Sequence, residues 1–400
     1  MRRAAAFILS ALLLTTSCSS VTAGTPVEQA PPVIAVAPAF DAPRARTDRG
    51  LVVKASGGKL AKVLAYVDGA PVTGRVDETG TLWRSDWALR PGAEYSVTAT
   101  ADGASGPSTM AAGRFRTRAA ERTFKVLSVS PLPGESVGVG MPIIVTFDTA
   151  IQDRPAVERA LEVTTAKPAE GAWRWISDTQ VVYRTRKYWT PKQKVTFVAH
   201  LSGVRAAPGV VGTEDHELAF TVGRKQISTV DTKTHQMVVR KNGAVVQRMA
   251  ISAGMATTRE YTTTSGVHLT MEKGNPVRMI SPGREKGDPG FYDVMISHAV
   301  RISNSGEYVH AKNNVWAQGR ANVSHGCINS RPDQAAWFFT TSLRGDPVTI
   351  TGTSRELEWN NGWGFWQLPW EKWQLGSALY DPTPKTGWVQ PAPPPTLPQQ

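Results

Sequence analysis

The sequence predicts a mostly β, multidomain protein with two tandem β-sandwiches, a β-rich third domain and a tryptophan-rich C-terminal extension. Its 400 residues exceed the length that one hydrophobic core usually serves. The 35 glycines and 28 prolines indicate many turns. Short runs of β-branched and aromatic residues recur between turn dipeptides such as Asp68-Gly69, Pro91-Gly92 and Asp102-Gly103. Only residues 330–342, with Pro332 in the first turn, have a clear helical pattern.

The N-terminus resembles an export signal. Arg2 and Arg3 precede an apolar run over residues 4–14, which is too short to span a bilayer and typical of a signal peptide. The following Thr15-Thr16-Ser17-Cys18 resembles a bacterial lipobox, so residues 1–18 are interpreted as a lipoprotein signal with Cys18 as the lipidation site. Plain cleavage after a small residue such as Ala23 is the alternative. Lipidation predicts a location outside the cytoplasm, anchored to the outer face of the cell membrane.

The next three segments contain no constellation of catalytic side chains. Residues 19–45 are proline-rich and are expected to form a flexible or polyproline linker. Residues 46–121 and 122–222 show period-two alternation and are each expected to form a small sandwich. The phrase from Ser130-Pro131 to Asp148 resembles bacterial immunoglobulin-like (Ig-like) domains. Both sandwiches are therefore interpreted as spacers, with a core that includes Trp173, Trp175 and Trp189.

The third domain is expected over residues 223–352. An Asn242-Gly243 hairpin signal joins two of its strand patterns, and the single helix follows Cys327 directly. The extension over 353–380 holds a cluster of tryptophans, namely Trp359, Trp363, Trp366, Trp370 and Trp373. These rings are interpreted as docking the extension onto the third domain, with a glycan-stacking platform as the alternative. The proline-rich tail over 381–400 is expected to be disordered.

Cys327 is the candidate nucleophile. The chain has two cysteines, and if Cys18 belongs to the signal, Cys327 has no disulfide partner. An unpaired thiol in an exported protein is a liability unless it is buried or used. His310, 17 residues upstream at the end of an apolar strand pattern, is a candidate base, with a structural histidine as the alternative. A nearby helix N-terminus is expected to lower the thiol pKa.

The segment from His310 to Ser324-His325-Gly326-Cys327-Ile328-Asn329 resembles the signature of the L,D-transpeptidases, the cysteine enzymes that cross-link peptidoglycan. The arrangement resembles the tethered actinobacterial lipoprotein type with two Ig-like domains, strongly over 223–375 and loosely over 46–222. The resemblance implies formation of 3→3 cross-links through a cysteine thioester, with release of terminal D-Ala from tetrapeptide stems. Donor and acceptor stem peptides are the implied partners, and carbapenem β-lactams are implied covalent inhibitors. No metal or cofactor is implied.

The resemblance also implies roles for individual residues. Cys327 would be the nucleophile and His310 the base, with the imidazole oriented by the carbonyl of Ala311. The oxyanion would be held by Tyr292 and by the amides of Gly326 and Cys327. Further positions follow the family pattern: Ser305, Gly306 and Asn329 would contact substrate, and Ser324 and His325 would shape the loop. The stretch 312–323, which includes Trp316, is shorter than the family pattern, and no role is carried over to it.

Three other functions are alternatives, and the sequence argues against two of them. A wall-peptide cysteine endopeptidase of the papain-like kind would place its cysteine before its histidine, the reverse of the order here. A non-catalytic wall-binding lipoprotein has no need of an exposed thiol. An L,D-carboxypeptidase would use the same site with water as acceptor, and the sequence does not separate it from a transpeptidase. The net charge of +12 suits anionic wall polymers or lipid headgroups, or is only a solvated basic surface. No nucleic-acid motif accompanies it.

Overall fold

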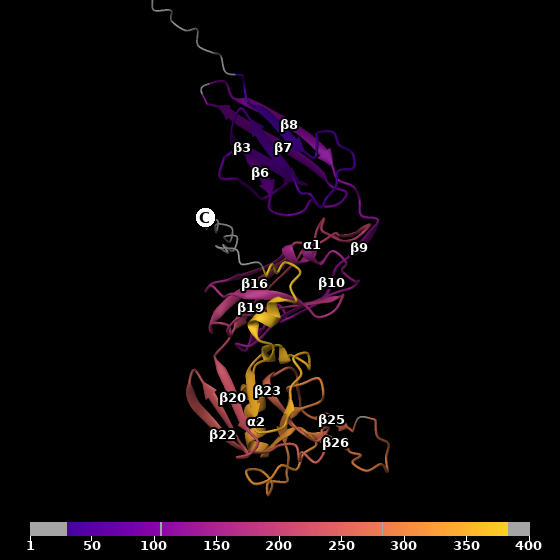
Figure 1. Cartoon of the computed structure of the whole chain (residues 1–400), viewed down its shortest axis with the longest axis vertical. Helices are drawn as coiled ribbons and strands as arrows, with labels where there is room; N and C mark the ends of the chain where they lie inside the picture. The colour runs from indigo at the N-terminus through magenta and orange to yellow at the C-terminus, as the bar shows by residue number, and fades with distance from the viewer. Residues whose placement is uncertain (1–29, 105, 282, 383–400) are drawn as a thin grey trace, which may run out of the picture.

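The computed structural model describes residues 30–104, 106–281 and 283–382. The chain forms two β-sandwiches and a third, β-rich domain, placed in a row (Figure 1), which confirms the expected fold class. The expected lipidation site Cys18 and most of the expected tail, 383–400, lie outside the described residues. Within the described ranges, no helix is both long and apolar enough to cross a bilayer.

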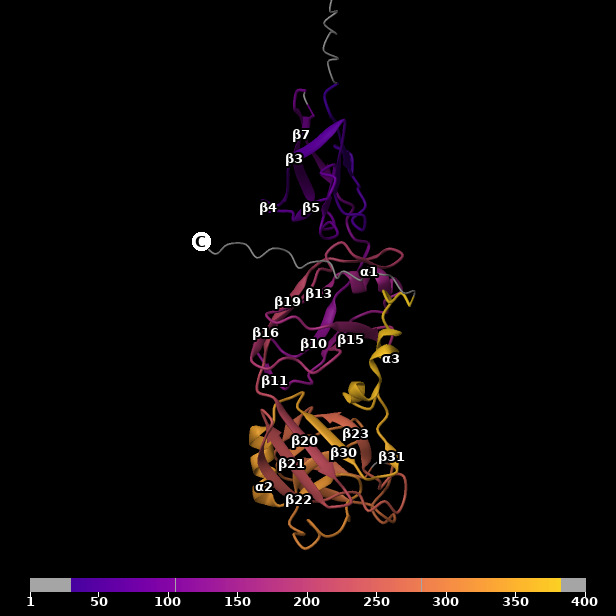
Figure 2. The same ribbon diagram turned by 60° about the vertical axis from the view of Figure 1, so that its left-hand side comes forward.

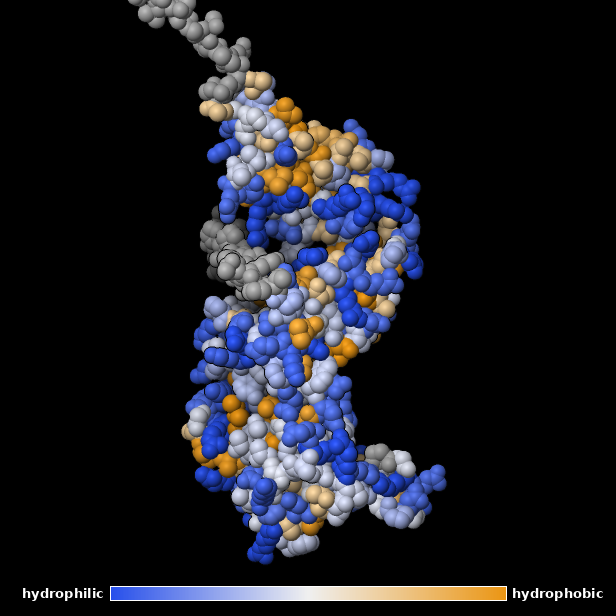
Figure 3. Space-filling view, in the orientation of Figure 1, coloured by the Kyte–Doolittle hydropathy of each residue, from blue (hydrophilic) through white to orange (hydrophobic). Residues whose placement is uncertain are grey.

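The first sandwich packs two four-stranded sheets around a shared core. One sheet has the order β1-β2-β6-β5, with bounds Val33–Ala37, Val52–Ser56, Leu82–Ser85 and Gly74–Val76. The other has the order β4-β3-β7-β8, with bounds Ala70–Pro71, Gly58–Val67, Glu94–Gly103 and Thr109–Arg116. Leu51, Val53 and Trp83 from one sheet region meet Val97 and Phe115 from the other. On the outer face, where Figure 3 shows an apolar area, strands β3 and β8 expose apolar side chains that include Leu64, Tyr66 and Met110.

Strand β1 corrects the expected linker. Val33–Ala37 lies within the range 19–45 and pairs antiparallel with β2, so this part of the range is a sandwich strand. Ile34 and Val36 pack against the first core, while the alternate residues Val33, Ala35 and Ala37 face solvent. The neighbouring prolines flank the strand and do not interrupt it, as expected for an edge strand. Proline content alone therefore misplaced the start of the first sandwich.

The second sandwich also has two four-stranded sheets. Their orders are β10-β12-β15-β14 (Val126–Ser130, Ile143–Phe147, Gln180–Thr185, Gly171–Trp175) and β11-β19-β16-β13 (Ser136–Val137, His216–Val222, Gln193–Ala199, Leu161–Thr165). A small sheet of β17, β18 and β9 (Arg205–Ala207, Val210–Gly212, Arg122–Phe124) and helix α1 (Arg154–Arg159) close one end. Trp173, Trp175 and Trp189 are buried in the core, which confirms that expectation. The Trp189 indole donates to Met141 O at 2.7 Å.

The third domain is built on a ten-stranded sheet in the order β24-β27-β28-β29-β22-β21-β20-β30-β23-β31. The bounds in that order are Lys273–Gly274, Ala299–Arg301, Tyr308–Ala311, Ile328–Ser330, Ala244–Ser252, Gln236–Lys241, Gln226–Asp231, Pro347–Thr351, Thr264–Leu269 and Arg355–Glu356. Helix α2 (Pro332–Thr341) matches the predicted helix and buries Phe338 in the core. Strands β25 (Val277–Ile280) and β26 (Asp293–Ile296) form a separate hairpin. Its tip projects from the domain, and Figure 3 shows a mainly hydrophilic surface there.

The C-terminal extension returns to the second sandwich. After β31 it forms a 3-10 turn (Gly364–Gln367) and helix α3 (Trp370–Gln374), and α3 lies beside the second sandwich (Figure 2). Trp373 is fully buried against Val182, and its indole donates to Ala172 O at 2.9 Å. The rings therefore do dock the extension, but the expectation that they dock onto the third domain is wrong for Trp373. Its partners in the second sandwich could not be identified from local sequence.

Arg184 of the second sandwich contacts two further rings of the extension. Its guanidinium lies 4.9 Å from the ring centroid of Trp366 and 5.4 Å from that of Trp370, and it donates to Leu368 O at 2.6 Å. Burial lowers the pKa of Arg184 to about 10. The five tryptophans of the extension are buried or half-buried, so they do not form an open row of rings for glycan stacking.

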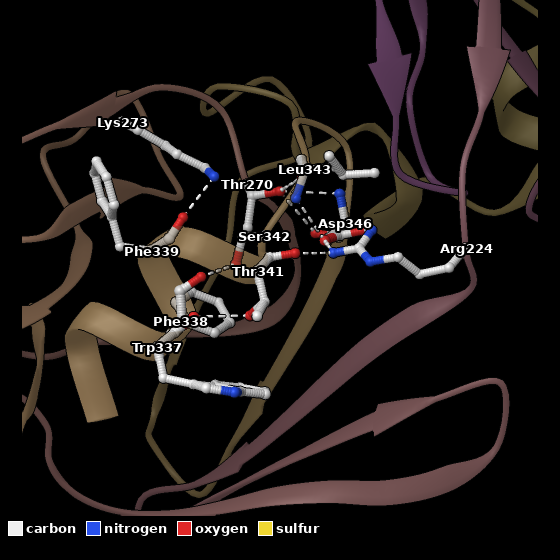
Figure 4. A network of polar contacts seen from close by, with 10 residues as sticks. All are labelled: Arg224, Thr270, Lys273, Trp337, Phe338, Phe339, Thr341, Ser342, Leu343 and Asp346. Atoms are coloured by element: carbon white, nitrogen blue, oxygen red, sulfur yellow. Dashed lines mark hydrogen bonds and ion pairs between the residues drawn. The ribbon is translucent and has the colours of Figure 1, made fainter. Parts of the chain in front are cut away.

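A polar network locks the third domain to the second sandwich. Arg224, in the connection between them, donates to the Asp346 carboxylate at 3.0 and 2.7 Å (Figure 4). Asp346 is 1% exposed, and its burial outweighs Arg224 and raises the carboxyl pKa to about 6. Nearby, Arg344 donates to the Glu135 carboxylate of the second sandwich at 2.9 and 3.1 Å. These contacts hold the third domain against the second sandwich.

Candidate active site

Two parallel strands bring the predicted catalytic residues to one region. In the pairing of β28 with β29, His310 is opposite Asn329 and Val309 is opposite Ile328. Cys327 precedes β29 directly, so it lies at the end of the strand that neighbours His310. Val309 and Ile328 are fully buried in the third core. Their burial holds the two strands in register, so that side chains far apart in sequence become neighbours.

His310 is held as a neutral base. The imidazole is 4% exposed, and its Nδ1 lies 2.9 Å from the carbonyl oxygen of Ala311. Because a carbonyl only accepts hydrogen bonds, Nδ1 must carry the proton, and Nε2 keeps a free lone pair. Burial lowers the pKa of His310 to about 4, partly opposed by the bond to Ala311. The contact that the resemblance assigned to Ala311 is thus present through its backbone.

Cys327 rests as a neutral thiol. The free cysteine is half-buried, and its Sγ donates to Gly306 O at 3.5 Å. Burial raises the pKa of the thiol to about 12, the nearby Glu307 raises it further, and the Tyr308 backbone amide opposes them. Helix α2 begins only at Pro332, after the intervening strand β29. The expected lowering of the thiol pKa by the helix dipole is therefore wrong.

The loop before Cys327 is fixed by its own side chains. Ser324 Oγ donates to Cys327 O at 2.6 Å and accepts from the Gly326 amide at 3.1 Å. Thr263 Oγ1 donates to Gly326 O at 2.7 Å, and Gly326 has a φ of 126°, which favours glycine. The Gly326 amide is thus already occupied, which corrects its expected role as an oxyanion donor. The Cys327 amide makes no hydrogen bond among the described residues.

Aromatic side chains cover His325 from two sides. The Tyr292 ring centroid lies 5.3 Å from that of His325, and the Tyr261 ring packs edge-on at 4.4 Å. Burial, followed by the electrostatic influence of Cys327, raises the pKa of Tyr292, so the hydroxyl stays protonated and able to donate. Burial and then Arg284 lower the pKa of His325. The structure therefore places Tyr292 beside the cysteine loop, with His325 between aromatic rings.

The predicted substrate-contacting residues separate into two groups. Ser305 and Gly306 are exposed in the turn before β28, and the Gly306 carbonyl faces the Cys327 thiol. Asn329 is 4% exposed within the sheet, between Ser252 and His310. Trp316, on the loop to which no role was assigned, is 62% exposed. A substrate contact by Asn329 stays a prediction, and its burial leaves little of it available.

Several residues at the site were not expected from the sequence. Glu307 is 4% exposed, and its carboxylate accepts from the Thr264 amide and hydroxyl, both at 2.7 Å. An acidic residue directly before the apolar pair Tyr308-Val309 was the one available signal. Arg284 of the projecting hairpin forms a bidentate pair with Glu260 at 2.6 and 2.7 Å, and this pairing has no local signature. Among the described residues, no three potential metal-binding side chains cluster.

Comparisons with known proteins agree with this arrangement. The L,D-transpeptidase catalytic domain family model matches residues 225–350, and the bacterial Ig domain model matches 42–205, a range that includes strands of both sandwiches. The chain is 35% identical over 336 residues to L,D-transpeptidase 2 of Mycobacterium tuberculosis (strain CDC 1551 / Oshkosh), covering 83% of this chain and 81% of that one. It is 33% identical to L,D-transpeptidase 5 of M. tuberculosis (strain ATCC 25618 / H37Rv), covering 80% and 71%.

Among solved structures, the L,D-transpeptidase LdtMt1 in complex with imipenem aligns with a TM-score of 0.49 and 34% identity, covering 56% of this chain and 98% of that one. The family matches and the sequence relatives define an L,D-transpeptidase catalytic domain that follows Ig-like sandwiches. The chain belongs to the L,D-transpeptidase family.

Proposed function

We propose that this L,D-transpeptidase uses Cys327 as its nucleophile and forms 3→3 peptidoglycan cross-links. The observation that carries the proposal is the His310 imidazole, whose Nδ1 is fixed by Ala311 O on the strand beside Cys327. A buried neutral imidazole with a free Nε2 is suited to accept the thiol proton. Because both groups are neutral at rest, proton transfer would accompany substrate binding.

The first half-reaction acylates the enzyme. His310 Nε2 takes the Cys327 proton, and the thiolate attacks the carbonyl of the third, L,D-linked stem residue. The Cys327 amide and the Tyr292 hydroxyl would stabilise the oxyanion. The carbon–nitrogen bond to the terminal D-Ala breaks, the imidazolium gives its proton to the leaving amine, and a thioester remains on Sγ.

The second half-reaction resolves the thioester. A side-chain amine on the third residue of a neighbouring stem attacks the thioester carbonyl, and His310 accepts the proton that this amine loses. The carbon–sulfur bond breaks and the thiol is restored when the imidazolium returns the proton. The product is a peptide bond between two third residues. Carbapenem β-lactams would acylate the same thiol by opening of their strained ring.

Product analysis tests this reaction. Purified protein is incubated with a disaccharide-tetrapeptide, and the products are separated and identified by mass spectrometry. A cross-linked dimer with release of D-Ala is expected. Tripeptide without dimer would replace transpeptidation by L,D-carboxypeptidation, with water as the acceptor. Absence of both products would exclude both reactions on this donor.

The anchoring at Cys18 is a separate proposal that rests on the lipobox-like sequence Thr15-Thr16-Ser17-Cys18. A lipid at this position would hold the chain at the outer face of the cell membrane. The two sandwiches would then carry the candidate site outward into the wall polymer. Protein recovered from cells is expected to partition into detergent, and Cys18→Ser is expected to abolish that partition. An intact mass showing a mature N-terminus beyond residue 18 would contradict the anchor.

A further inference from the structure

The turn that faces the Cys327 thiol is held from outside the matched catalytic range. Ser305 and Gly306 are exposed, and the Gly306 carbonyl accepts from Cys327 Sγ at 3.5 Å. Gly306 has a φ of 92°, in the left-handed region that favours glycine. The next amide, that of Glu307, donates to Ser303 Oγ at 3.1 Å, and Ser303 Oγ lies 2.9 Å from Ser305 Oγ. The orientation of this acceptor therefore depends on Ser303 and Ser305 together.

Asn361 of the C-terminal extension makes two hydrogen bonds to Ser305. The Ser305 amide donates to Asn361 Oδ1 at 3.0 Å, and Asn361 Nδ2 donates to Ser305 Oγ at 3.0 Å. Two reciprocal bonds to one residue fix both its backbone and its side chain. Asn361 itself is half-buried, whereas both bonds to Ser305 lie at the exposed surface.

Gly362 brings the extension directly against the same turn. A Cβ at this position would lie 3.0 Å from Asn304 N and 3.3 Å from Ser303 Cα, and the residue has a φ of 68°. Only glycine permits this approach without displacing the turn. The side chain of Ser303 continues the contact, because its Oγ lies 2.9 Å from Ser305 Oγ. The extension and the turn are thus packed as one surface.

The extension is itself anchored to two domains by residues that follow Asn361. Gln367 Oε1 accepts from the Val267 amide of the catalytic sheet at 2.6 Å. The Trp366 indole donates to Gly140 O of the second sandwich at 2.9 Å, and Trp373 is buried in that sandwich. The position of Asn361 is therefore set by the catalytic sheet and by the second sandwich together.

We propose that Asn361 is a positioning residue, which acts through the Ser305-Gly306 turn to hold the Gly306 carbonyl at the Cys327 thiol. The proposal deepens the function proposed above and rests on Cys327 being the nucleophile. The carbonyl accepts from the neutral thiol, so it favours the thiol over the thiolate and fixes the direction of the sulfur. Loosening the turn would therefore lower the pKa of the Cys327 thiol. It would also misdirect the sulfur during its attack on the substrate.

The test measures two rates in the full chain carrying Asn361→Ala. The first is alkylation of Cys327 by iodoacetamide as a function of pH, which requires no peptidoglycan substrate. The second is acylation by meropenem, which requires a correctly directed sulfur. We expect the alkylation profile to shift to lower pH and acylation to slow by about tenfold, as for loss of about one net hydrogen bond.

Three variants serve as controls. Asn360→Ala changes the neighbouring exposed asparagine, which has no hydrogen bond to the turn among the described residues, and it should match the wild type. Asn361→Asp keeps an acceptor for the Ser305 amide and offers a second one to the Ser305 hydroxyl, so it should restore both rates. In a Ser305→Ala background, Asn361→Ala should shift the alkylation profile less than it does in the wild type.

The outcomes separate this inference from the proposed function. An alkylation profile that is unchanged in Asn361→Ala would overturn the positioning role, even if acylation falls, because the effect would then not pass through the thiol. Failure of Asn361→Asp to restore the profile would overturn it as well. If the wild type makes no product from tetrapeptide donor, the proposed function fails, while the alkylation comparison still decides the role of Asn361.

Discussion

The two sandwiches differ in how they are joined to the rest of the chain. The first meets the second through contacts that include a Thr47 hydroxyl bond to Gly203 O at 2.8 Å and a stack of Trp87 on His200 with centroids 3.6 Å apart. The second is joined to the third domain by Arg344, by the connection around Arg224 and by the C-terminal extension. Among the described residues, no hydrogen bond or ion pair links the first sandwich to residues 223–352.

This difference indicates two different roles. A sandwich that only precedes the catalytic domain acts as a spacer, which sets the distance between the catalytic domain and the chain before the sandwich. A sandwich that receives the tryptophan-rich extension helps to fix the extension, which in turn touches the turn beside Cys327. The second sandwich and the third domain are thus expected to unfold as one cooperative unit, and the first sandwich as another.

The largest expected effect comes from Trp373→Ala. This ring is fully buried between the extension and the second sandwich, so its removal should destabilise the joint unit by about 3–5 kcal/mol. Calorimetry should show the transition of the joint unit moving to lower temperature, with the transition of the first sandwich unchanged. Trp316→Ala removes a 62% exposed ring of the third domain and should cost little. Equal shifts in the two variants would contradict the bridging role of the extension.

The next effect depends on pH. Burial raises the Asp346 pKa from 3.8 to about 6, so between these values the folded state binds the proton more tightly than the unfolded state. The stability of the joint unit should therefore fall as pH rises from about 4 to about 6, by up to about 3 kcal/mol. Asp346→Asn should remove this dependence, whereas Asp333→Asn, at an exposed acid, should keep it. If the stability of Asp346→Asn falls with pH as steeply as that of the wild type, the pH dependence does not come from Asp346.

A smaller loss of stability is expected when Arg344 is replaced. Its guanidinium bonds Glu135 and Ser130 of the second sandwich in a partly buried setting, so Arg344→Met should cost about 1–2 kcal/mol. The matched change in the first sandwich is Arg114→Met, whose pair with Glu94 is largely exposed and should contribute close to nothing. Chemical denaturation of both variants measures the comparison. A loss from Arg114→Met as large as that from Arg344→Met would remove the distinction between the two sandwiches.

The smallest catalytic effect is expected from Trp87→Ala. Removing the stack on His200 should widen the range of orientations of the first sandwich, which small-angle scattering would detect. Acylation by meropenem should stay within about twofold of the wild type, because the first sandwich does not support the site. A large loss of acylation would mean that the first sandwich is more than a spacer.

Much of the fold could be predicted from the sequence because it is encoded locally. The Asn242-Gly243 turn signal predicted the hairpin of β21 and β22, and Pro332 marked the start of α2. The proximity of His310 and Cys327 followed from the family signature, and the structure places His310 on β28 and Cys327 directly before the neighbouring strand β29. These features depend on nearby residues or on a motif whose spacing is constrained.

The remainder depends on contacts between distant residues. Trp373 was expected to dock onto the third domain, but its partners Val182 and Ala172 lie about 200 residues away in the second sandwich. The occupied Gly326 amide and the raised thiol pKa of Cys327 arise from folding of the loop and burial, which no local pattern reports. Strand β1 was missed because prolines on either side of Val33–Ala37 hid a strand whose partner begins only at Val52.

The most direct test of the proposed function is to locate the acyl group. The full chain is incubated with disaccharide-tetrapeptide donor, quenched in acid to preserve a thioester, digested and analysed by mass spectrometry. We expect one modified peptide, containing Cys327, with the mass of the donor less its terminal D-Ala, and no modified peptide in Cys327→Ala. Product formation that persists in Cys327→Ala, or an acyl group on another residue, would contradict the assignment of Cys327 as the nucleophile.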